Sequence, residues 1–174
     1  MKQIITKETP LKTILELAAP CTCNSCSNGC KHGSGIMVGE DKKNIAKFLN
    51  ISEKELDEKY LEGVEQFNKK FQRPKLIREN KPYGKCIFFD GKLCTIHEVK
   101  PLQCKTSIGC KDYGEEISSW FLLNNLLDEH DPEAVRQYSQ FIQNKGKVIP
   151  GGNLEEIVPD KIKLRKILNY EMLK

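Results

Sequence analysis

Apolar residues recur at helical spacing in the N-terminal half of the chain, and polar residues mark where each run begins. Thr9 followed by Pro10 predicts a helix that ends near Ala19. Asp41 is expected to cap a second helix, and Ser52 to begin a third through a capping box. The third helix is predicted to carry an apolar stripe of Leu56, Tyr60, Val64 and Phe67.

The C-terminal part of the chain shows the same periodicity. It predicts helices at residues 117–127, 132–144 and 160–173, with Asp131 as the cap of the middle one. The last of these is rich in lysine and arginine. Its basic residues are expected to form a solvated face, with contact to a protein or RNA partner as the alternative. The predicted fold class is mainly α.

Extended structure is expected in two short places. Residues 36–38 could form a strand, and residues 86–96 predict a tight β-hairpin with Asp90-Gly91 at its turn. A two-residue turn would place Cys86 and Cys94 on opposite faces of this hairpin. A three-residue loop pairs Phe88 with Lys92 and places the two cysteines opposite each other, which we predict if they share an ion. Residues 72–85 are expected to be a long loop.

Composition limits the class of protein. The chain has 174 residues, of which 39% are apolar, so a single domain spanning 1–174 can bury a core. The net charge of +4 does not argue for nucleic acid. No stretch is apolar enough for a membrane span, and the patch Ile14–Ala19 is too short for a signal-peptide core. We therefore expect a cytoplasmic protein without a membrane partner.

Eight cysteines carry the strongest chemical signal, and they fall into two groups of four. In a reducing compartment, clustered cysteines are more often metal ligands than disulfides. The alternative is buried free thiols with some redox pairs. We expect a metal-binding core at 21–110, a helical extension at 117–174, and these metal ligands: Cys21, Cys23, Cys26 and Cys30 in the first group, and Cys86, Cys94, Cys104 and Cys110 in the second.

Four thiolates suit either zinc or an iron–sulfur cluster. The ferredoxin and radical-SAM spacings are absent or incomplete, so zinc is preferred over iron. His32 and His97 lie near the cysteines and are expected to stay outside the ligand set, although a histidine can replace one thiolate. Nearby lysines, including Lys100, are either ordinary surface residues or compensate the thiolate charge. No residues suggest a catalytic acid/base pair or a cofactor loop.

The cysteine pattern resembles the YkgJ-type cysteine-cluster family, described as zinc- or iron-chelating proteins. That family's first motif is Cys-x2-Cys-x2-Cys-Cys, which Cys23-x2-Cys26-x2-Gly29-Cys30 overlays with glycine in place of the third cysteine. Its second half resembles the run from Cys86 through Ile87-Phe88-Phe89 to Cys94, and on through Pro101 to Cys104.

The resemblance implies metal chelation across residues 21–110. Because Gly29 replaces one cysteine, Cys21 is the candidate for the missing sulfur and Cys110 for a further ligand. A related motif occurs in a flagellin lysine methylase, where it is associated with an iron–sulfur cluster. We therefore expect a structural or binding module that chelates zinc or iron, with a redox or methyl-transfer iron–sulfur enzyme as the alternative.

Overall fold

A computed structural model describes residues 3–18, 27–107 and 112–173. The chain divides into two compact units. The cysteine unit comprises residues 18–64 and 70–112, and the helical unit comprises residues 1–17, 65–69 and 113–174. Helix accounts for 47% of the described residues and strand for 11%, which confirms the predicted mainly helical class.

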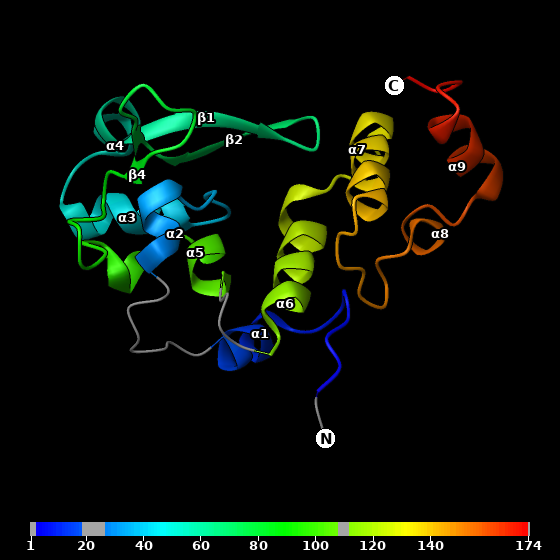
Figure 1. The fold of residues 1–174 in the computed structure, drawn as a ribbon, viewed down its shortest axis with the longest axis horizontal. Helices are drawn as coiled ribbons and strands as arrows, with labels where there is room; N and C mark the ends of the chain where they lie inside the picture. The colour runs from blue at the N-terminus through cyan, green and yellow to red at the C-terminus, as the bar shows by residue number, and fades with distance from the viewer. Residues whose placement is uncertain (1–2, 19–26, 108–111, 174) are drawn as a thin grey trace. The chain divides into compact units, whose positions relative to one another are not determined.

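The helical unit contains the C-terminal helices, coloured from yellow-green to red in Figure 1. Its elements are α1 (Leu11–Leu17), α6 (Gly114–Phe121), the π-helix η3 (Leu122–Leu126), α7 (Pro132–Gln143), α8 (Leu154–Ile157) and α9 (Lys161–Leu168).

Local capping explains where these helices begin. The Asp131 carboxylate accepts a hydrogen bond from the Glu133 N–H, as predicted, and Asp160 accepts from the first turn of α9. Tyr138 is fully buried on α7, and its hydroxyl donates to the Gly152 carbonyl at 2.7 Å. Helices were predicted at 117–127, 132–144 and 160–173. All three are present, but the last one ends at Leu168, earlier than predicted.

The cysteine unit contains shorter helices. They are α2 (Ser27–His32), α3 (Asp41–Leu49), α4 (Glu53–Tyr60), the 3-10 helix η2 (His97–Val99) and α5 (Leu102–Thr106). The helices predicted at Asp41 and Ser52 are confirmed, and the Ser52 hydroxyl accepts from the Glu55 N–H. Asp41 is not the cap of its helix, however, because Glu40 holds the N-cap position and Asp41 is the first helical residue. Ile45 and Leu56 are fully buried and join α3 to α4 through the core of this unit.

The described ranges also contain two small antiparallel sheets, formed by β1 (Leu61–Gln66) with β2 (Lys69–Pro74) and by β3 (Leu76–Ile77) with β4 (Lys85–Cys86). Residues 65–69, at the turn between β1 and β2, belong to the helical unit, and the rest of both sheets belongs to the cysteine unit. The prediction that the third helix continues past Tyr60 was wrong. The chain turns at Phe67 and Asn68, whose φ angles of 48° and 59° are those of a two-residue hairpin turn. The prediction of a long loop at residues 72–85 was also wrong, because this range contains the end of β2 and the whole of β3.

The hairpin predicted at 86–96 reverses direction at Asp90-Gly91, but in neither predicted register. Phe89 bridges Cys94 in an antiparallel pair, and Cys86 pairs with Leu76 of β3 instead. The reason is the Asp90 carboxylate, which accepts from the N–H groups of Lys92 and Leu93 and closes a wider turn.

Residues 36–38 are not a strand, although the Met37 N–H donates to the Gln72 carbonyl at 2.9 Å. In the described ranges, no helix is long and apolar enough to cross a membrane.

Candidate metal centre

Four of the eight cysteines lie in the described part of the chain, each on a different segment of the cysteine unit. Cys30 is on α2, Cys86 on β4, Cys94 after the Asp90 turn and Cys104 on α5. All four are free thiols. The other predicted ligands lie outside the described residues: Cys21, Cys23, Cys26 and Cys110.

The four described thiols are neighbours, although up to 74 positions separate them along the chain. A negative charge on Cys30, Cys86 or Cys94 raises the pKa of Cys104, and a charge on Cys30 or Cys94 raises that of Cys86. Cys30 reaches this group because α2 contacts β4, and it packs beside the apolar cluster that contains Cys86. The fold therefore places Cys30 with cysteines of the second sequence group.

Burial raises the pKa of every one of these thiols. The pKa of Cys86 rises to about 11 and that of Cys104 to about 12. The Lys100 ammonium acts in the opposite direction on Cys30 and Cys94, whose pKa values it lowers. Lys100 is thus one of the predicted lysines whose charge favours thiolates here.

Main-chain amides face three of the sulfurs. The Cys86 sulfur receives a hydrogen bond from the Phe88 N–H, and the Cys94 sulfur receives one from the Ile96 N–H. The Gly35 N–H does the same for Cys104. The Phe89 N–H donates to the Cys86 carbonyl at 2.9 Å. An N–H group stabilises a thiolate far more than a neutral thiol, because the charged acceptor makes the stronger hydrogen bond. These N–H groups therefore lower the pKa of the three thiols, but burial has the larger effect and the pKa of each stays raised.

The chemistry of this donor set fits a thiophilic metal such as zinc or iron. Among the residues in the described ranges, however, no three His, Cys, Asp or Glu side chains form a group that could already hold an ion. The thiols are near enough to act on one another's pKa values, but in the described ranges they do not form a coordination sphere. Among the described residues, the side chains of Cys30, Cys86, Cys94 and Cys104 are the ones whose chemistry could hold such an ion.

The two histidines near the cysteines, His32 and His97, form no ligand group with the thiols in the described ranges. The His32 ring makes an edge contact with the Tyr83 ring at 5.7 Å between centroids, and His97 is an exposed residue of η2. Their place outside the ligand set stays a prediction.

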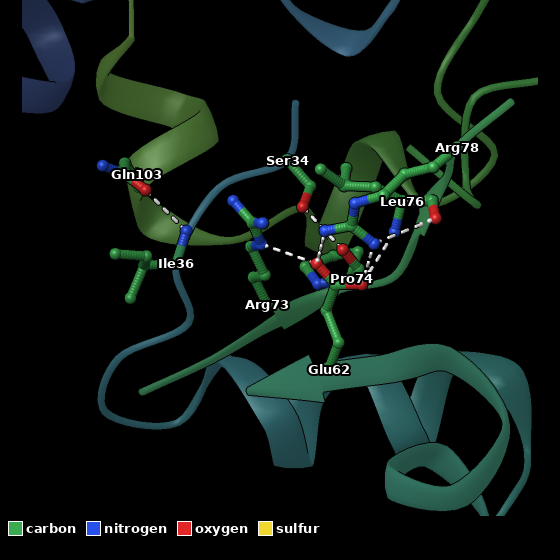
Figure 2. A network of polar contacts seen from close by, with 8 residues as sticks. All are labelled: Ser34, Ile36, Glu62, Arg73, Pro74, Leu76, Arg78 and Gln103. Carbon is green, nitrogen blue, oxygen red and sulfur yellow. Dashed lines mark hydrogen bonds and ion pairs between the residues drawn. The ribbon is translucent and has the colours of Figure 1, made fainter. Parts of the chain in front are cut away.

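A polar network supports the segments that carry Cys86 and Cys104 (Figure 2). The Ser34 hydroxyl donates to the Pro74 carbonyl at 2.6 Å, and the Ile36 N–H donates to the Gln103 side-chain oxygen. Residues 34–36 therefore lie between the strand that leads to β3, which pairs with Cys86, and the helix that carries Cys104.

Glu62 anchors the first of these segments. Its carboxylate pairs with Arg73 at 3.0 Å and Arg78 at 2.6 Å, and also accepts from the Leu76 N–H. The hydrogen bond from Arg78 is the main cause that lowers the pKa of Glu62 from 4.5 to about 2. The carboxylate is thus ionised, and it fixes the chain on both sides of Pro74.

The model of the CxxCxxCC family, whose description is "Putative zinc- or iron-chelating domain", matches residues 22–121. The chain belongs to this family. No curated protein and no solved structure matches it significantly.

Membership in the CxxCxxCC family confirms the resemblance seen in the sequence. The matched range contains every cysteine except Cys21 and covers all four segments that meet in the structure. The function shown is that of the family, a domain that chelates zinc or iron. The eight-cysteine ligand set is untested and stays a prediction.

Sequence patterns missed the residues that support the thiols. No pattern singled out Gly35 or Gln103, and Asp41 was expected only at the start of a helix, yet each of them contacts a segment far away in the chain. Pro101 directly precedes α5, whose first residue is Leu102, and the sequence predicted no helix there.

Proposed function

We propose that this protein is a zinc-binding structural or binding module in which Cys30, Cys86, Cys94 and Cys104 bind one zinc ion as thiolates. The observation that carries the proposal is the set of main-chain N–H groups that favour the thiolate form of three of the four thiols, against the larger effect of burial, which raises their pKa. Neutral buried thiols gain little from such donors, whereas thiolates on a metal need their charge offset.

Zinc is favoured because the four thiolates come from four separate segments. A closed four-thiolate site is the usual form of structural zinc, and it would join α2, β4, the Asp90 turn and α5. Binding energies of about 10–16 kcal/mol are typical of such sites. The proposal also implies a reducing compartment such as the cytoplasm, because clustered thiols oxidise elsewhere.

The predicted ligands outside the described residues remain part of the proposal as candidates for a second ion. They are Cys21, Cys23, Cys26 and Cys110. An iron–sulfur cluster would use the same thiolates, so the experiment must separate the two metals.

The test is to purify the protein anaerobically, record its visible spectrum, and measure zinc, iron and sulfide per chain. Serine variants of the four described cysteines are then compared after replacement of zinc by Co²⁺, whose absorption reports thiolate ligands. We expect a colourless zinc protein in which C30S, C86S, C94S and C104S each lose thiolate–cobalt absorption. Ile96→Val, a variant of a buried neighbour of Cys94, controls for core disturbance and should keep it.

Iron and sulfide in stoichiometric amounts would show that the site holds an iron–sulfur cluster and not zinc. Unchanged metal content and cobalt absorption in all four serine variants would reject the proposed ligand set.

A further inference from the structure

Asp41 is a buried carboxylate, with 9% of the residue exposed. One of its oxygens, Oδ2, accepts two main-chain hydrogen bonds, from the Val38 N–H at 2.9 Å and from the Leu102 N–H at 3.0 Å. Burying a carboxylate is costly unless hydrogen bonds replace its water. The two bonds therefore indicate a specific role for this side chain.

Leu102 is the first residue of α5, the short helix that carries Cys104. The first N–H groups of a helix have no partner within it and are commonly satisfied by a side chain just before the helix. Here that position is held by Pro101, which makes no side-chain capping bond. Asp41 supplies the cap instead, from 61 positions earlier in the sequence.

Two further contacts run parallel to this cap. The Ile36 N–H donates to the Gln103 side chain, as Figure 2 shows, and the Gly35 N–H donates to the Cys104 sulfur. Residues 35–38 are thus joined to residues 102–104 at three successive points. The carboxylate of Asp41 lies at one end of this seam and the Cys104 sulfur at the other.

We propose that Asp41 is a positioning residue for the metal site, which holds α5 against residues 35–38 so that Cys104 reaches the ion. This inference rests on the proposed function, because it assumes that Cys104 is a ligand. Residues that orient a metal ligand from outside the coordination sphere commonly change metal affinity by about 10–100-fold.

The test compares D41A and D41N with the wild-type chain. Zinc affinity is measured by competition with a chromogenic chelator, and the thiolate–Co²⁺ absorption is recorded on the same proteins. We expect D41A to bind zinc about 10–100-fold more weakly and to lose part of the thiolate–cobalt absorption. D41N should fall between D41A and wild type, because its amide oxygen still accepts but lacks the charge.

Asp57→Ala is the matched control. Asp57 is a partly exposed carboxylate of the same unit whose hydrogen-bond partners are Lys42 and Gln72, and neither of these belongs to α5. D57A should keep both the affinity and the absorption of the wild type.

The C104S variant distinguishes a failure of the proposed Asp41 role from a failure of the proposed function. If C104S loses thiolate–cobalt absorption while D41A matches the wild type in both measurements, the role of Asp41 is rejected and the proposed function stands. If C104S matches the wild type, the proposed function itself fails. Should D41A be unfolded by circular dichroism, D41N decides. A loss of affinity of about threefold or more supports the role, and an unchanged affinity rejects it.

Discussion

Gly35 lies so close to α5 that the structure leaves no room for a side chain. A Cβ at this position would stand 2.5 Å from the Cys104 sulfur, 3.1 Å from the Cys104 main-chain nitrogen and 3.3 Å from the Gln103 Cβ. Separations this short force atoms to move. Because a main-chain atom is among the neighbours, a rotation of one flexible side chain cannot relieve the contact.

The substitution Gly35→Ala should therefore push α5 away from residues 35–38. Overpacking of this kind costs about 1–3 kcal/mol, and the hydrogen bond from the Gly35 N–H to the Cys104 sulfur would weaken as well. We expect a lower free energy of unfolding in urea and weaker zinc binding in the chelator competition. Both effects have the same origin, so they should appear together.

Gly63→Ala provides the control, because a Cβ on Gly63 would meet no atom within 4 Å. That variant should match the wild type in unfolding and in zinc affinity. A G35A protein as stable as G63A, with wild-type zinc affinity, would show that the close approach of Gly35 to Cys104 is not a feature of the protein.

Three further measurements test other parts of the structure. Glu62 has its pKa lowered from 4.5 to about 2, so its contribution is present above about pH 4.5 and is lost as the pH falls towards 2. After allowance for solvent screening, the wild type should lose about 1–2 kcal/mol more than E62Q across this range, and equal slopes in urea unfolding would contradict the pairing. Since burial raises the pKa of Cys86 and Cys104, zinc binding at pH 7 should release protons, which titration calorimetry in buffers of different ionisation enthalpy detects. Zinc uptake without proton release would mean that these thiols are not ligands. In the helical unit, Tyr138→Phe should cost about 1–3 kcal/mol by leaving the Gly152 carbonyl unsatisfied, whereas a Tm equal to wild type would argue against that buried hydrogen bond.

Local signals were enough to locate most helices from the sequence. Asp131 and Ser52 each accept a hydrogen bond from an N–H group two or three positions later, so their capping role can be predicted from nearby residues alone. The hairpin of β1 and β2 was missed because Val64 and Phe67 continue the helical spacing of α4. Phe67 adopts a left-handed conformation that its residue type disfavours, and so it gave no turn signal.

The residues that support the thiols could not be predicted, because their partners are distant in the chain. Asp41 reads locally as the start of α3, and in the structure it is the first residue of that helix. Its second bond, to Leu102, exists because the fold brings α5 to this place. The roles of Gln103 and Gly35 likewise depend on the contact between residues 34–36 and α5, which the sequence does not reveal.

The grouping of the cysteines also depends on contacts between distant segments. Spacing assigns Cys30 to the N-terminal group, since three other cysteines precede it within ten residues. In the structure its charge acts on Cys86, Cys94 and Cys104, because α2 contacts β4. Short spacing limits how far apart two sulfurs can be, but it does not decide which sulfurs the core brings together. The proposed ligand set draws on four segments that pack together in the cysteine unit, so substitution of Cys30 should affect the same ion as substitution of Cys104.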